Sequence, residues 1–156
     1  MDYTFEIRKL SSLFYTSYPQ SNFPEIERKN ARGYATLLVD THDGYLICIP
    51  FRSHINHEFA YMFKNSVRSQ TNASGLDYTK ICIIKNLDYI DDSPGIVDTD
   101  EYTEMRDNLN EIVQAACDYV DGYVSHIKGI AILSRRQFRK KYWYTTLKYF
   151  HAELGI

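Results

Sequence analysis

Residues 33–57 read GYATLLVDTHDGYLICIPFRSHINH, and this stretch decides the fold that we expect for the chain. Two runs rich in β-branched and aromatic residues, 33–39 and 45–49, flank an Asp-Gly pair, which is a strong short-range signal for a β-hairpin. Pro50 follows the second run and has no N–H to donate to a sheet. We therefore expect regular strand pairing to stop at Pro50 and the chain beyond it to present side chains.

The residues directly after Pro50 are suited to phosphoryl chemistry. They are Arg52, Ser53, His54, Asn56 and His57. A guanidinium is a permanent cation whose planar fork matches phosphate oxygens, and a hydroxyl can donate to the same oxygens. Imidazoles titrate near neutral pH and can exchange protons. No other segment of the chain concentrates so many such groups.

Three interpretations of this segment remain open from the residues alone. His54, His57 and Glu58 could bind a metal ion, although their His-x-x-His-Glu order differs from the zincin His-Glu-x-x-His. The histidines could instead cap backbone groups of a polar loop. The third interpretation is metal-independent RNA cleavage, in which the substrate's own 2′-hydroxyl attacks the phosphate and the protein supplies only proton transfer and oxyanion stabilisation.

The remaining elements are expected from periodicity and from start and stop signals. They are a strand at 3–8, a short helix at 10–18, a helical turn at 57–63, a loop at 65–77, a buried strand at 80–85, further strand near Pro94, one long helix at about 100–127 and a last helix beginning at Ser134. Asp98 with Glu101 is expected to cap the long helix. Ser134 and Gln137 form a capping box for the last one. Strands early and helices late predict an α+β fold with a small antiparallel sheet.

Charge is distributed unevenly along the chain. The net charge is −2, yet residues 88–121 hold eleven acidic residues and one basic, while residues 128–148 hold seven basic residues and no acidic one. Four of these cations fall in the first two turns of the last helix: Arg135, Arg136, Arg139 and Lys140. Cations near a helix N-terminus oppose the macrodipole, so stability alone does not explain them. An anionic partner such as RNA does, while two solvated faces of opposite sign are the alternative.

Length and composition are those of one globular domain, which we place at residues 1–156. No apolar run approaches the roughly 20 residues that span a bilayer, and no secretory signal is visible, so the expected compartment is the cytoplasm. Cys48, Cys82 and Cys117 have no metal-binding spacing and are expected to be free thiols.

The segment IPFRSHINH at 49–57, together with KNARGY at 29–34, resembles the endoribonuclease toxins of type III toxin–antitoxin systems. These are the ToxN/AbiQ-like proteins, and the similarity is greatest to their CptN and TenpN branch. The resemblance implies a partly closed, barrel-like sheet related to the Kid/MazF core. It also implies sequence-selective RNA cleavage without metal or other cofactor, giving 2′,3′-cyclic phosphate and 5′-hydroxyl ends.

The implied partners are cellular single-stranded RNA and a small pseudoknot RNA antitoxin held in a closed protein–RNA assembly, with neither DNA nor membrane involved. Ser53 matches the family serine, and Ile55 stands where better-known relatives carry a lysine. We expect Arg52 and Ser53 to hold the phosphate and His54 or His57 to exchange protons. Expected RNA contacts are Arg32, Tyr34, Asn56, Lys80, Lys85 and the four cations of the last helix. A non-catalytic RNA- or protein-binding module, or a toxin held by a protein antitoxin, is the alternative.

Overall fold

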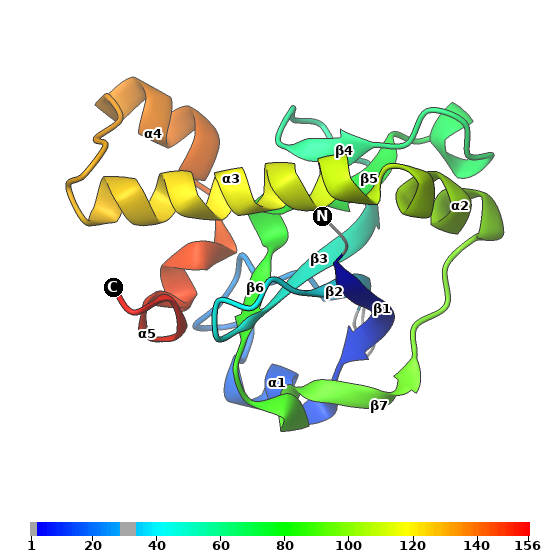
Figure 1. Cartoon of the computed structure of the whole chain (residues 1–156), viewed down its shortest axis with the longest axis horizontal. Coiled ribbons are helices and arrows are strands. Elements are labelled where there is room, and N and C mark those ends of the chain that lie inside the picture. The colour runs from blue at the N-terminus through cyan, green and yellow to red at the C-terminus, as the bar shows by residue number, and fades with distance from the viewer. Residues whose placement is uncertain (1–2, 29–33) are drawn as a thin grey trace.

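The computed structural model describes residues 3–28 and 34–156, which form one α+β arrangement (Figure 1). Seven strands pair antiparallel in the order β4-β5-β3-β2-β1-β7, and β6 pairs with β3. Their bounds are β1 Thr4–Leu10, β2 Ala35–Asp40, β3 Leu46–Ser53, β4 Ala60–Met62, β5 Ser74–Asp77, β6 Cys82–Ile84 and β7 Ile90–Pro94. Among the described strands, β4, β6 and β7 each pair with a single neighbour and are edges, so the sheet is open rather than closed.

The predicted hairpin forms from β2 and β3, with Leu37 opposite Ile49 and Asp40 opposite Leu46. Pro50, however, does not end the strand as we expected. β3 pairs with β6 up to Cys48 and with β5 from Phe51 onward, while β2 pairs along its other side as far as Pro50. Pro50 therefore lies where β3 changes partners on one side, between the stretch paired with β6 and the stretch paired with β5.

Two segments have a different structure from the one expected. Residues 57–63, expected to be helical, contain β4, and residues 65–77, expected to be a loop, contain the short 3₁₀ helix η1 (Arg68–Gln70) and the fully buried β5. β4 and β5 pair with Tyr61 opposite Leu76. They extend the sheet beyond β3 and form the part of the sheet in which most of the candidate site is built.

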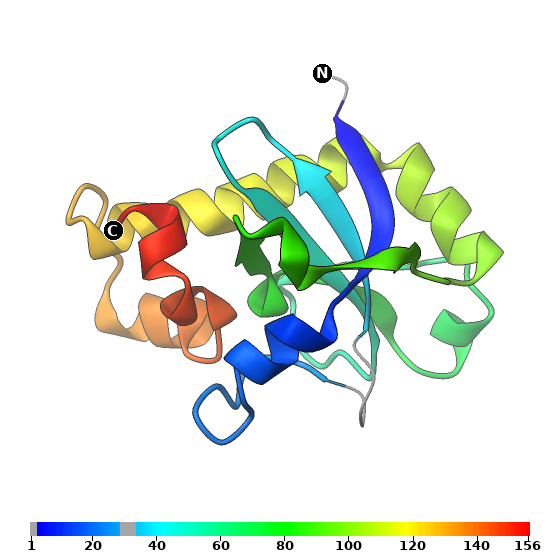
Figure 2. The same cartoon turned by 90° about the horizontal axis from the view of Figure 1, so that it is seen from below.

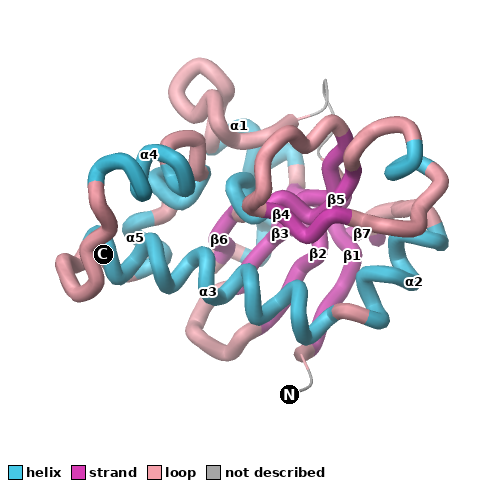
Figure 3. The backbone as a smooth tube through the Cα atoms, turned by 90° about the horizontal axis from the view of Figure 1, so that it is seen from above, coloured by secondary structure: helices cyan, strands magenta, loops and turns pink. Residues whose placement is uncertain are grey.

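The helices are α1 Ser12–Ser17, α2 Thr99–Asp107, α3 Leu109–Ile127, α4 Arg135–Tyr142 and α5 His151–Leu154, with 3₁₀ helices η2 Tyr78–Lys80, η3 Leu87–Tyr89 and η4 Thr146–Tyr149. The single helix expected at 100–127 is broken at Asn108, which has φ −120° and whose side-chain amide donates to the Glu104 carbonyl at 2.8 Å. α3 crosses the strands with α2 near one end and α4 and α5 near the other (Figures 1 and 3).

α1 lies on the far side of the strands from α3 (Figure 2). Between them a continuous core includes Leu37, Ile49, Leu76, Ile112 and Phe150, each completely buried. The expected free thiols are confirmed, and Cys48 and Cys82 lie within this core. The capping box of α4 is also confirmed, because Gln137 N–H donates to Ser134 Oγ at 3.1 Å and Ser134 N–H donates to Gln137 Oε1 at 3.0 Å.

Candidate active site and nucleic-acid interface

A completely buried carboxylate, Asp77, lies at the centre of the polar groups around β3 and β5. It accepts hydrogen bonds from the Thr79 backbone N–H at 3.0 Å and the Thr79 hydroxyl at 2.6 Å, forms an ion pair with Arg52, and lies 3.2 Å from His57 Nε2. A buried charge is tolerated only when it is paired and hydrogen-bonded, and Asp77 satisfies both conditions. Asp77 was not among the expected site residues, because residues 65–77 were expected to be a loop and Asp77 in fact ends β5.

Strand register explains how Arg52 reaches Asp77. Arg52 on β3 is opposite Gly75 on β5, and Asp77 is two residues beyond Gly75, so all three lie on the same face of the sheet. Gly75 is required there, because a Cβ atom at that position would overlap the Tyr61 carbonyl oxygen. Arg52 also pairs with Glu27 at 3.3 Å. The positive charge of Arg52 is therefore already neutralised by two carboxylates, those of Asp77 and Glu27.

The pKa of Asp77 is lowered from its ordinary value. Burial raises it, but hydrogen bonds from His57 and Thr79 and the positive charge of Arg52 outweigh that effect. The carboxylate therefore stays ionised at neutral pH.

His57 uses both of its ring nitrogens within the fold. Phe59 donates its backbone N–H to Nδ1 at 3.1 Å, so Nδ1 must carry a lone pair. In the neutral ring the proton is then on Nε2, which lies 3.2 Å from Asp77 Oδ2. Both ring nitrogens therefore have partners within the fold, and through them His57 connects the loop after β3 to β5.

Ser53 and His54 form a separate, solvent-accessible pair. Ser53 Oγ lies 3.1 Å from His54 Nδ1, and the His54 side chain is exposed. Neighbouring residues of a strand face opposite ways, so Ser53 is on the other face of β3 from Arg52. The structure therefore does not bring Arg52 and Ser53 together as joint phosphate ligands. His54 has φ 58°, in the left-handed region that residues other than glycine rarely adopt.

Ile55 anchors the loop that carries His54. It is only 6% exposed, and its N–H donates to the Ala73 carbonyl at 3.1 Å. Ile55 is therefore a packing residue, and it supplies no cation to the surface around His54. Asn56, the next residue, is exposed and available to a ligand.

The three residues of the metal-binding interpretation do not converge. His54 contacts Ser53, His57 contacts Asp77, and Glu58 pairs with Lys140 at 3.8 Å. Within residues 3–28 and 34–156, no group of three or more histidine, cysteine or acidic side chains is arranged to hold a metal ion.

The two lysines expected to bind RNA lie at opposite ends of β6. Lys80 is half-buried and donates to the Tyr144 carbonyl at 3.0 Å. Burial lowers its pKa, and the carboxylates of Glu27 and Asp77 offset this only in part. Lys85 is at the end of β6 next to the start of β3, since Ile84 is opposite Leu46. It is therefore roughly 26 Å along β3 from Ser53, too far to act at the same phosphate.

Tyr34 is half-buried just before β2, whereas Arg32 is outside the described residues. The four cations expected on the last helix all lie on α4. At about 100° per residue, Arg135, Arg136, Arg139 and Lys140 fall within an arc of about 140°, with Trp143 near its middle. We call these five residues the α4 arc. Among the four cations, Lys140 alone has an ion-pair partner within the described part of the chain, and that partner is Glu58.

The α4 arc lies next to the loop that carries His54. The Lys140–Glu58 pair joins α4 to that loop, and the Lys80–Tyr144 hydrogen bond joins the residue after Trp143 to the end of η2. Figure 1 shows α4 beside the loop that leads into β4. Segments that are far apart in the sequence thus contact one another at these two points.

A second buried carboxylate, Glu101 on α2, fixes the 64–74 segment. It accepts from Ser66 Oγ at 2.9 Å, Ser74 Oγ at 2.8 Å and Arg68 Nη2 at 2.7 Å. Glu101 was expected to cap α2, and Asp98, the N-cap residue, makes no side-chain cap hydrogen bond. Glu104, also on α2, accepts from the backbone N–H groups of Lys64 and Asn65 at the start of the same segment. The expected RNA-tracking loop is therefore tied to α2.

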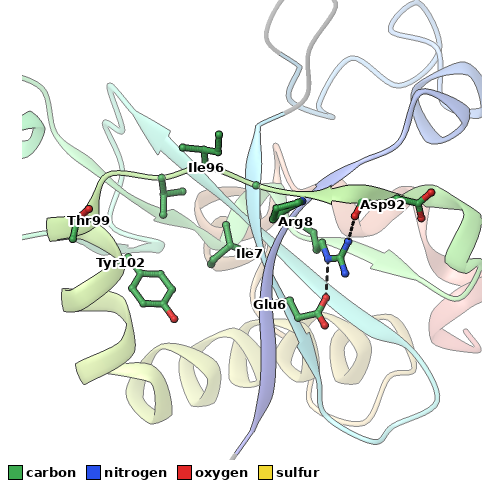
Figure 4. A pocket seen from close by; sticks show the side chains of 10 residues that line it. Glu6, Ile7, Arg8, Asp92, Ile96, Thr99 and Tyr102 are labelled. Atoms are coloured by element: carbon green, nitrogen blue, oxygen red, sulfur yellow. Dashed lines mark hydrogen bonds and ion pairs between the residues drawn. The ribbon is translucent and has the colours of Figure 1, made fainter.

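A broad depression of about 670 Å³ lies between β1, β7 and the start of α2, lined by Glu6, Arg8, Asp92, Ile96 and Tyr102 among others (Figure 4). Arg8 is already engaged there, with Glu6 Oε2 at 2.8 Å and the Asp92 carbonyl at 2.6 Å. The bond to Asp92 joins β1 to β7, so we treat this depression as structural.

Comparison of the chain with protein-family models, with curated proteins and with solved structures finds no match. No described helix is both long and apolar enough to cross a membrane.

Proposed function

We propose that this protein is a sequence-selective, metal-independent endoribonuclease, the toxin of a type III toxin–antitoxin system. The observation that carries the proposal is the Ser53–His54 pair: an exposed imidazole 3.1 Å from a hydroxyl, beside the α4 arc. An antiparallel sheet with α3 and a basic α4 is compatible with the partly closed Kid/MazF-like core of that family. We also propose that the protein acts in the cytoplasm and is inhibited by a small pseudoknot RNA antitoxin.

In the proposed reaction, His54 removes the proton from a ribose 2′-hydroxyl, and the 2′-oxygen attacks the adjacent phosphorus. The bond from phosphorus to the 5′-oxygen breaks, that oxygen takes up one proton from water, and protonated His54 returns to the solvent the proton that it removed. The products are a 2′,3′-cyclic phosphate and a 5′-hydroxyl, with no change of oxidation state. Ser53 donates to a phosphate oxygen, and the α4 arc holds the flanking phosphates.

Arg52 and His57 have a supporting role in this proposal. Both are bound to Asp77 and keep the loop that carries His54 in place. Asn56, which is exposed beside His54, is available to orient the substrate. The pKa of Lys80 is perturbed by burial and by the charges of Glu27, Asp77 and Arg52, and perturbed pKa values are common at functional sites.

The test is incubation of the purified protein with single-stranded RNA in EDTA, followed by analysis of the new ends. We expect cyclic-phosphate ends, and a loss of cleavage of about 100-fold or more in Ser53→Ala and His54→Ala. His42→Ala is a matched control, because His42 is also exposed and has φ 62°, but lies in the β2–β3 turn. RNA that stays intact, or cleavage unchanged by His54→Ala, would refute the assignment.

Binding without cleavage would favour the alternative of a non-catalytic RNA-binding module. The antitoxin is tested separately by isolating the native complex and treating it with ribonuclease. An RNA antitoxin predicts that the complex disassembles, whereas a complex that survives would indicate a protein antitoxin.

A further inference from the structure

Core packing does not explain the position of Trp143, because half of this large side chain is exposed to solvent. It is the only tryptophan of the chain, and it is 51% exposed. The guanidinium of Arg139 lies over the indole ring, 4.7 Å from its centroid. Tyr142, the preceding residue, is buried in the core instead. A large aromatic ring left half in water, with an arginine stacked on it, is a typical recognition element.

Beside Trp143 the surface is hollowed into a depression of about 450 Å³, lined by His126, Leu133, Arg135, Phe138, Arg139 and Trp143. This volume is within the roughly 300–1,000 Å³ of small-molecule sites. Phe138 is held in place by His126, whose ring stacks on it at 4.3 Å between centroids. His126 is itself fixed, because the Leu133 N–H donates to its Nδ1 at 3.0 Å. The depression is thus walled by ordered aromatic rings and edged by two arginines.

The charges around the depression define what can occupy it. Arg135 and Arg139 have no acidic partner within the described part of the chain. Arg136, elsewhere on the α4 arc, has no acidic partner there either. An occupant therefore needs both a flat apolar body and negative charge. An unpaired nucleotide has both, since its base presents a π-face and its phosphates are anionic.

We propose that Trp143 and the depression beside it form a stacking site for an unpaired nucleobase of RNA, with Arg135 and Arg139 on the adjoining phosphates. The choice of RNA as the ligand rests on the proposed function. The stacking site lies on the arc that Lys140 joins to the His54 loop, so a bound strand extends from the stacked base toward the cleavage site. The site therefore holds a base that flanks the scissile bond rather than one of the two nucleotides that the bond joins.

A membrane surface is the competing occupant, because Ile130 and Ile132 in the α3–α4 connection are 74% and 72% exposed. Exposed aliphatic residues next to cations are also found where proteins bind anionic membranes. We favour a nucleobase, because the ring at the centre of the cations is a cation-stacked tryptophan and the depression beside it is walled by aromatic side chains.

Because the chain has one tryptophan, its fluorescence reports directly on this site. We would titrate the protein with a 2′-O-methyl oligouridine, which lacks the attacking hydroxyl and cannot be cleaved by the proposed reaction. We expect saturable quenching of Trp143, and a salt dependence set by the phosphates that the arc contacts. Vesicles containing anionic lipid provide the comparison titration.

Variants separate stacking from charge. With a labelled oligonucleotide and anisotropy, Trp143→Ala should weaken binding by about 5- to 150-fold, the range for one base stacked on an aromatic ring. Trp143→Phe should recover much of the affinity. Comparison of its circular dichroism spectrum with that of the wild type shows whether the variant is folded. Arg139→Gln should weaken binding and reduce the salt slope, whereas Arg106→Gln, an exposed arginine on α2, should change neither.

The results distinguish this inference from the proposed catalysis. Quenching by the oligonucleotide in a protein that does not cut RNA would support the stacking site and refute the endoribonuclease assignment. Cleavage of RNA with unaltered Trp143 fluorescence, or with equal affinity in Trp143→Ala, would overturn the stacking site alone. A spectral shift with vesicles but none with the oligonucleotide would also overturn it, in favour of a membrane surface.

Discussion

Replacement of the buried carboxylate by an amide, Asp77→Asn, is the most informative perturbation of the site. The substitution keeps the shape of the side chain but leaves Arg52, 19% exposed, with Glu27 at 3.3 Å as its remaining carboxylate partner. It also removes the charge that His57 faces. Breaking a buried ion pair by removing one partner costs about 3–5 kcal/mol. Domains have a total stability of about 5–15 kcal/mol, so the variant should remain folded but be markedly weakened.

Urea denaturation followed by circular dichroism measures this loss. The control is Asp107→Asn, because Asp107 is 62% exposed and its pair with Arg106 at 3.4 Å should contribute less than about 1 kcal/mol. A loss of less than about 1 kcal/mol in Asp77→Asn would refute the role that we assign to this carboxylate.

The same variant should also change the response to acid. The folded-state pKa of Asp77 lies below its unfolded value, so its contribution to stability is present above about pH 4 and is lost as the pH falls through the folded-state pKa. The amide of the variant does not titrate, so the difference in unfolding free energy between wild type and variant should shrink below about pH 4. A difference that stays constant with pH would contradict the ion-pair account.

Three further predictions test other parts of the structure. Glu101→Gln should lower the free energy of unfolding by about 2 kcal/mol, measured by urea denaturation, because Ser66, Ser74 and Arg68 lose their shared charged acceptor. It should also increase proteolytic cleavage between residues 64 and 73, and unchanged proteolysis would contradict this. Gly75→Ala should cost about 1–3 kcal/mol in the same assay, since the added methyl group would overlap the Tyr61 carbonyl, and a neutral effect would refute the close approach of β4. His54→Gly should leave stability unchanged or raise it by up to about 1 kcal/mol, because glycine relieves the φ of 58°, while RNA cleavage is lost; a large destabilisation would mean that His54 is structural.

The sequence predicts those elements whose signals are local. The Asp-Gly turn of the β2–β3 hairpin and the capping box at Ser134 each depend on residues within a few positions of one another. The apolar stripe of α3 was also predicted, but not the break before it. Asn108 ends α2 because its side chain bonds to the backbone, as asparagine often does, and the apolar pattern continues through that position unchanged.

The sequence does not reveal β5, because the four residues SGLD of this strand carry no β-branched side chain and no alternating pattern. Their burial depends on partners that are distant in the sequence. Asp77 needs Arg52, 25 residues earlier, and Ser74 needs Glu101, 27 residues later. A polar segment whose charges are matched only in the folded chain is indistinguishable from a loop when it is read on its own.

These two carboxylates also explain why the candidate site is where it is. Ser74 and Asp77 are three residues apart on a strand, so they face opposite sides of β5. Glu101 binds Ser74 on one face, and Arg52 and His57 both contact Asp77 on the other, so the strand is held from both faces. Ser53 is opposite Ser74 in the register. The His54 loop thus leaves the sheet from a fixed point, and the buried Ile55, whose N–H donates to the Ala73 carbonyl, anchors the residue after His54. A rigid loop that carries an exposed histidine in a left-handed conformation, next to cations supplied by α4, is what a site for proton transfer on a bound phosphate requires. In the proposed site the positive charge comes from α4, some 80 residues further along the chain. The sequence predicts these cations, and the fold adds that Lys140 lies beside the His54 loop.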